Sequence, residues 1–265
     1  MNLIVQGYPA YCYTGGRAFD PALRTIIFVH GAALDHSVWQ WQSRYFAHHG
    51  FSVLAPDFPA HGKSPGVARK QIASMADWIA ALIESACLEK AIVVGHSMGS
   101  LVALDLALNH AKRVEKLALI GTSNPMAVSE PFLAAARDDS PAAFDMQTAW
   151  GHTRASLLTQ SPVPGMSLLG ASRQLNGRAL PGVQAADLNA CATYAPSIDA
   201  IRALKVPTLI VGGSRDQMTP MRAGQALAGE IPGARFVALD AGHAMTSEAP
   251  GAMVKALSAF FVIPA

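Results

Sequence analysis

The sequence predicts an α/β protein with a doubly wound, mostly parallel sheet and one inserted helical segment. Short, fully apolar runs rich in β-branched residues alternate with longer runs of helical periodicity along most of the chain, as in sheets whose parallel strands are joined by crossover helices. Residues 123–205 lack a strand-like period and are rich in Ala, Ser, Pro and Met. We therefore expect residues 1–122 and 206–265 to form the core, and residues 123–205 to form a helical lid (cap) on it.

The expected elements follow one another in a regular order. The strands begin with a short hairpin at the sheet edge within residues 2–15 and continue at 24–29, 51–55, 90–94, 116–120, 208–211 and 235–239. Helices are expected between the strands, at 37–49, 71–87, 101–108 and 220–231, and after the last strand, at 248–261. Gly50 follows the first of these helices and Pro220 begins the fourth, as is typical of helix ends and helix starts.

Composition and charge exclude several classes of protein. Hydrophobic residues make up 51% of the 265 residues and charged residues 14%, which is enough to fill a large core and too apolar for disorder. The net charge of +2, without a basic stripe or an RNA-binding aromatic motif, argues against a nucleic-acid partner. The most apolar long window, residues 91–108, is broken by polar residues, so no membrane span is predicted.

The cysteines and the N-terminal residues of the sequence bear on the cellular compartment of the protein. Cys12, Cys87 and Cys191 are odd in number and far apart, so they predict no disulfide framework and suit a reducing interior. The segment from Met1 to Tyr8 lacks a basic stretch and a long apolar run, so no signal peptide is expected. We therefore expect a cytoplasmic protein.

The most informative segment is Gly95-His96-Ser97-Met98-Gly99, which lies between a strand-like run and a helix-like run. The chain must reverse here within a few residues, and glycines on both sides of the serine remove the Cβ atoms that would block the turn. The segment matches the nucleophile-elbow pattern G-x-S-x-G, which exposes the serine oxygen at the carboxyl end of a strand. Ser97 is therefore the predicted nucleophile. Met98 begins a helix, so its outward N–H is a predicted donor to an oxyanion.

A serine hydroxyl needs a histidine that takes its proton and a carboxylate that orients this histidine. In a parallel sheet these groups must lie at the carboxyl ends of strands. His243 meets the condition because it follows the last strand, directly after Gly242. Asp216 follows the preceding strand and is the predicted orienting acid.

Two other carboxylates are candidates for this acid. Asp57 also follows a strand, but the loop directly after it suits a turn or cap role better. Asp240 lies too near His243 in the sequence to point back at it easily. The predicted order along the chain is then Ser97, Asp216, His243, which is the order that the α/β-hydrolase fold uses.

With these residues the chain resembles the serine hydrolases of the α/β-hydrolase fold, over essentially its whole length except the predicted lid. The resemblance rests on four segments: His30-Gly31-Ala32-Ala33 with Trp39 downstream, Asp57 to Ser64, Gly95 to Gly99, and Gly213 to Asp216 together with Gly242-His243, Glu248 and Pro250. It implies a second backbone donor to the oxyanion, the N–H of Ala32. Ala60 stands where many members have glycine, which is a departure within a loop. Some members carry the acid after the strand at 116–120, where this chain has no carboxylate.

The substrate is less well determined by the sequence. His96, Trp150, Met218 and Met245 are the candidates for the substrate pocket, since methionine forms adaptable apolar walls and Trp150 lies in the predicted lid. A serine at the elbow argues against relatives that use an aspartate nucleophile. Apart from Arg215, few basic residues flank the loops of the three predicted catalytic residues, which favours an uncharged, fairly apolar acyl group.

We therefore predict an enzyme that hydrolyses carboxylic esters of small, fairly apolar substrates through an acyl-enzyme, with no metal ion and no cofactor. A lactonase and a carbon–carbon bond hydrolase of ring-cleavage products are alternatives within the same chemistry. Met245 weakens the second alternative, because such hydrolases often have a tryptophan there. The alternative of another class is a noncatalytic ligand receptor on the same fold. The expected partner is a small-molecule ester or lactone, and the expected assembly is a monomer or a homodimer.

Overall fold

The computed structural model describes residues 1–158 and 161–261. Residues 159–160, inside the predicted lid, and residues 262–265, at the end of the predicted core, lie outside the described residues.

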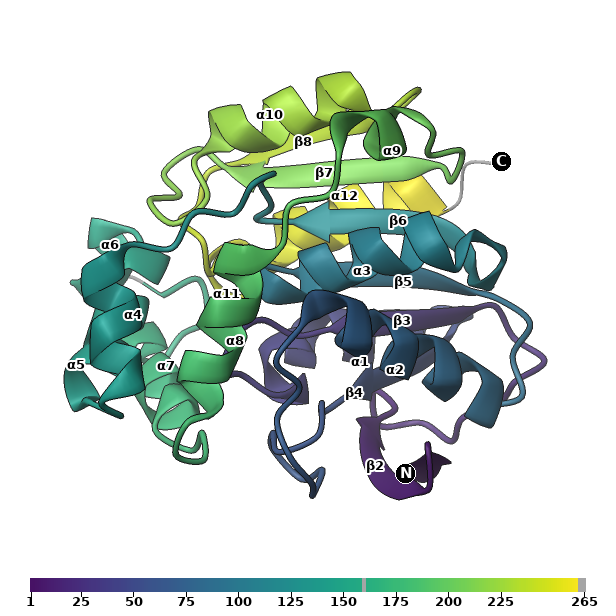
Figure 1. Ribbon diagram of the computed structural model, residues 1–265, viewed down its shortest axis with the longest axis horizontal. Coiled ribbons are helices and arrows are strands. Elements are labelled where there is room, and N and C mark those ends of the chain that lie inside the picture. The colour runs from purple at the N-terminus through teal and green to yellow at the C-terminus, as the bar shows by residue number, and fades with distance from the viewer. Residues whose placement is uncertain (159–160, 262–265) are drawn as a thin grey trace.

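An eight-stranded sheet runs through the molecule in the order β1-β2-β4-β3-β5-β6-β7-β8 (Figure 1). Its strands are β1 (Asn2–Val5), β2 (Tyr8–Tyr13), β3 (Thr25–Val29), β4 (Ser52–Pro56), β5 (Ala91–His96), β6 (Val114–Ile120), β7 (Thr208–Gly213) and β8 (Arg235–Leu239). β1 pairs with β2 and β2 with β4 in antiparallel fashion, whereas all the other neighbours are parallel. The predicted edge hairpin and the mostly parallel sheet are therefore confirmed.

The central strands send alternate side chains to two separate cores. In β3 and β5, Ile27 and Val93 belong to one core while Ile26 and Ile92 belong to the other, and all four are fully buried. Both faces of each strand are therefore covered, which explains why the strands read as continuous apolar runs and not as alternating ones.

Helices cover both faces of the sheet. Residues of α2 (Ile72–Ser85), α3 (Met98–Asn109) and α10 (Met221–Glu230) join the first core, and residues of α1 (Gln40–Ala47) and α12 (Pro250–Phe261) join the second. In Figure 1, α3 lies in front of the sheet and α12 behind it. This arrangement is the doubly wound layering that the sequence predicts.

Two predicted helices differ from the structure at their starts. The helix expected at 37–49 begins as a 3₁₀ turn (His36–Trp39), because Asp35 accepts the N–H of Ser37 and caps it there. The helix expected at 248–261 is preceded by a separate one-turn helix, α11 (Met245–Glu248). Pro250 begins α12 instead, since proline has no N–H to donate and suits the first turn of a helix.

The helical insertion is the segment between β6 and β7, and its elements in the described part of the chain are all helices. They are α4 (Glu130–Arg137), α5 (Pro141–Gly151), α6 (Arg154–Leu157), α7 (Leu168–Asn176), α8 (Val183–Thr193) and α9 (Ile198–Arg202). α4 to α8 gather at one side of the sheet (Figure 1), whereas α9 packs beside α10. Among the described residues, no helix has the length and apolar character needed to cross a membrane.

Candidate active site

The elbow at Ser97 is a strained turn between β5 and α3. Ser97 has φ +54° and ψ −121°, a region that a non-glycine residue occupies only when its surroundings force it. A Cβ on Gly95 would collide with the backbone carbonyl of Gly99, and a Cβ on Gly99 would collide with that of Val29. The Ser97 N–H donates to Ile120 O at 2.9 Å, which anchors the turn to β6. Ser97 thereby stands at the carboxyl end of β5.

Asp216 and His243 come together from the loops that follow β7 and β8. The His243 Nδ1–H donates to Asp216 Oδ2 at 2.8 Å, and the Thr219 hydroxyl donates to the same oxygen at 2.8 Å. The other carboxylate oxygen accepts the backbone N–H groups of Met218 and Thr219, each at 2.8 Å. Burial alone would raise the pKa of Asp216, but His243 and these donors outweigh it, and the pKa lies below its ordinary value. Asp216 is therefore an anion held in one orientation.

This contact decides which nitrogen of His243 is free. A carboxylate can only accept a hydrogen bond, so the proton of the neutral ring lies on Nδ1 and the lone pair on Nε2. Nε2 is buried and meets no hydrogen-bond partner among the described residues. A Cβ on Gly121 would lie 3.1 Å from the His243 ring, so glycine is needed there for the ring to take this position. The ring is poised to accept a proton from a hydroxyl group in the adjoining cavity.

The two alternative acids lie elsewhere. Asp240 is 80% exposed and pairs with Arg215 at 2.6 Å. Asp57 is fully buried and accepts both the N–H and the Nδ1–H of His36, at 2.7 and 2.8 Å. Neither carboxylate is hydrogen-bonded to His243 within the described residues.

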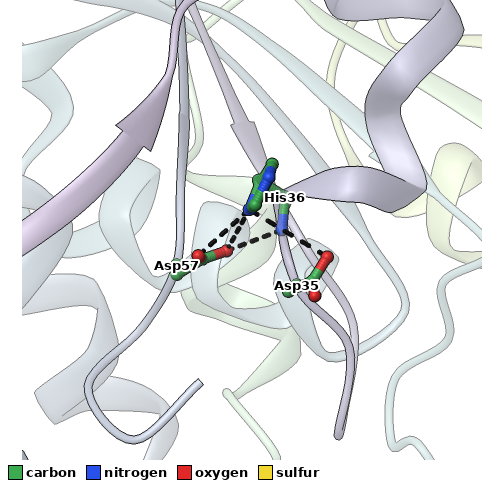
Figure 2. Close-up of side chains that lie close together, drawn as sticks. All are labelled: Asp35, His36 and Asp57. Atoms are coloured by element: carbon green, nitrogen blue, oxygen red, sulfur yellow. Dashed lines mark hydrogen bonds and ion pairs between the residues drawn. The ribbon is translucent and has the colours of Figure 1, made fainter. Parts of the chain in front are cut away.

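Asp35, His36 and Asp57 also form a cluster whose polar atoms lie within 4.8 Å of one another, with His36 between the two carboxylates (Figure 2). Both carboxylates already accept hydrogen bonds: besides the contacts with His36, Asp57 Oδ2 accepts the N–H of Lys63 at 2.9 Å, and Asp35 Oδ1 accepts from Ser37. The cluster ties the loop after β4 to the loop after β3, and its chemistry is that of a structural tie. That the protein needs no metal ion stays a prediction.

The two predicted oxyanion donors flank Ser97. Met98 is the first residue of α3, and Ala32 lies in the loop after β3, next to Gly31. A Cβ on Gly31 would lie 3.2 Å from the Ser97 Cβ, so this loop passes close to the serine. In the described part of the chain, the N–H groups of Ala32 and Met98 donate to no protein acceptor, and both remain available to a ligand.

Ser97 and His243 together line two spaces of different size. The larger is a cavity of about 300 Å³, whose walls are Met126, Ala127, Val128, Ser129, Phe132, Trp150, Leu188, Cys191, Gln217, Met218 and Thr219. The smaller is a chamber of about 60 Å³ whose lining includes Ala32, His96, Gln147, Thr148, Met218 and Asn176. The predicted pocket residues Trp150 and Met218 thus line the cavity, and His96 and Met218 line the chamber. Each space receives residues from both the core and the helical insertion.

His96 also supports the loop that carries His243. Its Nε2–H donates to the carbonyl oxygen of His243 at 2.9 Å, and the two ring centroids lie 4.8 Å apart. Burial, and then the neighbouring His243 ring, lower the pKa of His96 to about 3. His96 is therefore a neutral ring that holds the histidine loop.

The prediction that Met245 lines the pocket is wrong. Met245 is fully buried in the second core, among residues such as Phe28 and Leu257. The chain enters α11 at this residue, so the side chain turns toward the helices behind the sheet and away from Ser97.

Three residues of the site, Phe132, Leu188 and Gln147, carry no motif that marks them in the sequence. The first two line the cavity, and Gln147 lines the chamber. They come from three different helices of the insertion, α4, α5 and α8, and no short-range pattern connects them.

Comparisons with known proteins agree with this architecture. The family model described as the alpha/beta hydrolase fold matches residues 24–250. The chain is 29% identical over 230 residues to the pimeloyl-(acyl-carrier protein) methyl ester esterase of Aromatoleum aromaticum, a match that covers 81% of this chain and 88% of the relative. It is 30% identical over 240 residues to the protein of the same name from Neisseria meningitidis serogroup B, with 84% and 87% covered.

Solved structures show the same likeness over the whole chain. The enol-lactonase from Burkholderia xenovorans superposes with a TM-score of 0.87 at 25% identity and covers 99% of this chain and 100% of its own. A thermophilic esterase from Thermogutta terrifontis shares the fold with a TM-score of 0.84 at 23% identity, with 98% and 97% covered. Because the family model spans most of the described residues and the fold matches from end to end, this chain belongs to the α/β-hydrolase family.

Proposed function

We propose that this esterase-type α/β hydrolase cleaves esters of an apolar acyl group with a small alcohol, through an acyl-enzyme on Ser97. The observation that carries the proposal is the position of Ser97 and His243 between a cavity of about 300 Å³ and a chamber of about 60 Å³. The two spaces match the two unequal parts of such an ester.

The mechanism follows from the contacts of three side chains. Ser97 Oγ attacks the ester carbonyl carbon while His243 Nε2 takes its proton. Asp216 keeps the Nδ1–H in place and stabilises the imidazolium that forms. The N–H groups of Ala32 and Met98 donate to the oxyanion of the tetrahedral intermediate, and the dipole of α3 adds to this stabilisation.

The remaining steps return the enzyme to its starting state. His243 gives its proton to the alcohol oxygen, the carbon–oxygen bond of the ester breaks, and the acyl group stays on Ser97. A water molecule then gives a proton to His243 and attacks the acyl carbon. The acid leaves, and Ser97 regains its proton.

The size of each space supports the assignment of the two halves of the substrate. Phe132, Leu188 and Trp150 give the cavity an apolar wall suited to an alkyl chain. The chamber has room for about two water molecules, each of which occupies roughly 30 Å³ in the liquid. A methyl or ethyl alcohol group is of that size. Two relatives are named as methyl ester esterases, which agrees with a small alcohol.

A lactonase is the second candidate. The enol-lactonase from Burkholderia xenovorans shares 25% of its residues and the whole fold with this chain. A lactone carries its acyl and alcohol groups in one ring, so it would fill the cavity and leave the chamber empty. Lactone substrates therefore belong in the same assay.

A cytoplasmic site of action is also proposed. The three cysteines are all unpaired, two of them buried, which suits a reducing compartment. The choice between a monomer and a homodimer stays a prediction.

The test is a rate profile with matched variants. Butanoate and hexanoate esters of methanol, ethanol, butanol and hexanol, and lactones of similar size, are assayed with the wild type and with Ser97→Ala. We expect methyl and ethyl esters to be preferred, and Ser97→Ala to lower kcat by about 10⁵- to 10⁶-fold. Equal rates for methyl and hexyl esters would refute the small-alcohol assignment. Undiminished activity in Ser97→Ala would refute the acyl-enzyme, and no hydrolysis by the wild type would favour a noncatalytic receptor.

A second variant separates the two spaces. Phe132→Ala enlarges the cavity and should shift the preferred acyl chain to longer lengths without changing the preference for a small alcohol. Leu158→Ala changes an exposed side chain of the insertion, 66% accessible, and serves as the control. An altered alcohol preference in Phe132→Ala would contradict the assignment of the acyl group to the cavity.

A further inference from the structure

We propose that two side chains of the helical insertion, Gln147 and Asp187, complete the oxyanion hole by fixing the peptide that follows its Ala32 donor. The inference rests on the proposed function, because it takes the N–H of Ala32 as a donor to the oxyanion. It adds positioning residues that lie on α5 and α8, outside the hydrolase core.

One peptide group is held at both of its ends. Gln147 Nε2 donates to the carbonyl oxygen of Ala32 at 2.9 Å. The N–H of Ala33, which belongs to the same peptide plane, donates to Asp187 Oδ2 at 2.8 Å. With its acceptor and its donor both engaged, this plane cannot rotate without breaking a hydrogen bond. The insertion therefore fixes the peptide on the C-terminal side of Ala32. The peptide that carries the Ala32 N–H is held within the core, where the His30 Nδ1–H donates to Gly31 O at 2.8 Å, so the donor residue is held from both sides.

The loop needs such support because its backbone is strained. Ala33 has φ +55°, a left-handed conformation that residues other than glycine, asparagine and aspartate seldom adopt. Ala33 has no polar side chain to stabilise the turn by itself. The neighbouring Gly31 lies so close to the nucleophile that a Cβ on it would be 3.2 Å from the Ser97 Cβ, so a small rotation here would move the loop against Ser97.

Each supporting side chain is itself anchored. Gln147 Oε1 accepts Gln184 Nε2 from α8 at 2.6 Å, which fixes the orientation of its amide. Asp187 is fully buried, and its Oδ2 also accepts His61 Nε2–H at 2.8 Å. The His61 Nδ1–H donates to Pro59 O at 3.0 Å.

Both ring nitrogens of His61 face acceptors, an arrangement that favours the imidazolium form, in which both nitrogens donate. Burial alone would lower the pKa of His61, but the Asp187 carboxylate outweighs it and raises that pKa above its ordinary value. Two further titratable groups face the ring: Asp57, which also favours the charged form, and His30, whose ring centroid lies 5.0 Å away and whose pKa burial lowers to about 4. His61 and Asp187 thus form a buried ion pair that holds the carboxylate against the loop.

The arrangement makes the oxyanion hole depend on where the insertion sits. When α5 and α8 lie on the core, both hydrogen bonds form and the Ala32–Ala33 peptide is fixed. If these helices lift, both bonds break together and the strained loop is free to relax. Catalysis then depends on the position of the insertion in two ways. The insertion forms walls of the cavity, and it also supports the loop that carries a donor of the oxyanion hole.

The experiment compares ester substrates with thionoesters, in which sulfur replaces the carbonyl oxygen. Sulfur accepts hydrogen bonds weakly, so an oxyanion hole speeds the ester far more than the thionoester. Gln147→Met removes the donor to Ala32 at similar side-chain size, and Asp187→Asn removes the charge that pairs with His61. Asp145→Asn, exposed on α5, and Gln225→Met, exposed on α10, are the matched controls.

We expect Gln147→Met and Asp187→Asn to lower kcat for esters by about 10- to 100-fold, less than the loss of a whole donor, with KM changed by no more than about threefold. The thionoester rate should fall much less, and the affinity for a trifluoromethyl ketone, which forms an oxyanion, should fall with kcat. Equal losses on ester and thionoester, or rates like those of the controls, would overturn the proposal. If Asp187→Asn fails to fold, as a lost thermal transition would show, Gln147→Met alone decides.

Failure of the underlying function gives a different result. If Ser97→Ala keeps the wild-type rate, the proposed function is wrong. If Ser97→Ala is inactive while both positioning variants match their controls, the function stands and only this inference fails.

Discussion

Replacement of Asp216 by asparagine tests whether its carboxylate selects the tautomer of His243. Asp216 Oδ1 accepts two backbone N–H groups, those of Met218 and Thr219, each at 2.8 Å. In Asp216→Asn the amide oxygen must keep this place, because an NH₂ group there would face two donors. The NH₂ group must then take the place of Oδ2 and point at His243 Nδ1, 2.8 Å away.

An NH₂ group donates, so Nδ1 must become the acceptor and the ring proton moves to Nε2. His243 then has no lone pair on Nε2 with which to take the proton of Ser97. The loss expected for a wrong tautomer in an otherwise intact site is about 10⁴-fold in kcat, or about 5 kcal/mol of transition-state stabilisation. Binding should change little, because neither oxygen of Asp216 is needed for contact with the substrate.

The assay is steady-state hydrolysis of p-nitrophenyl butanoate, with the rate of labelling by a fluorophosphonate as an independent measure of Ser97 reactivity. Asp240→Asn is the control, since Asp240 lies on the neighbouring loop but is 80% exposed. A loss of less than about tenfold in Asp216→Asn would refute the tautomer argument. An equal loss in Asp240→Asn would refute the choice of acid.

Two further predictions concern a glycine and a buried ion pair. Gly121→Ala should lower kcat by about 10- to 100-fold, because the new Cβ would lie 3.1 Å from the His243 ring. Gly165→Ala is the control, since Gly165 also has a positive φ but a Cβ there would meet nothing within 4 Å, and kcat should not change. Equal effects of the two substitutions on kcat would contradict the steric argument. The pKa of His61 is raised above 6.5 by Asp187, which outweighs burial, so the pair stabilises the fold fully below pH 6.5 and loses this effect as the pH rises through the raised pKa. The difference in Tm between the wild type and His61→Gln should therefore become smaller as the pH rises above 6.5, and a difference independent of pH would be evidence against the ion pair.

The sheet and the residues at its carboxyl edge could be predicted from the sequence because each depends on local pattern. Buried parallel strands are continuous apolar runs, and Gly95 and Gly99 mark the turn between a strand and a helix. Loops that follow parallel strands meet at one edge of the sheet, so the positions of Asp216 and His243 after two late strands sufficed to bring them together. The 2.8 Å contact between these two side chains is the result expected from that rule.

Met245 shows where local pattern misleads. Two residues after His243 is close in sequence, but a one-turn helix begins there and turns the side chain to the opposite face. Sequence distance from a functional residue does not determine direction once the chain changes from loop to helix.

Gln147 and Asp187 show what sequence pattern does not contain. Gln147 lies 115 residues from its partner Ala32, and Asp187 lies 154 residues from Ala33. Neither side chain belongs to a motif, and each is an ordinary polar residue on a helix until the insertion packs on the core. The same holds for Phe132 and the other walls of the cavity, whose volume exists only between packed helices.

The family, the loops that carry the predicted catalytic residues and the type of chemistry could therefore all be predicted from the sequence. These follow from backbone geometry repeated within a few residues, at the elbow and at the strand ends. The sizes of the two spaces beside Ser97, and the two side chains that hold the Ala32–Ala33 peptide, became known from the three-dimensional structure. Both depend on how the helical insertion packs, and packing between distant helices is selected by overall shape and burial, which no local spacing of residues encodes.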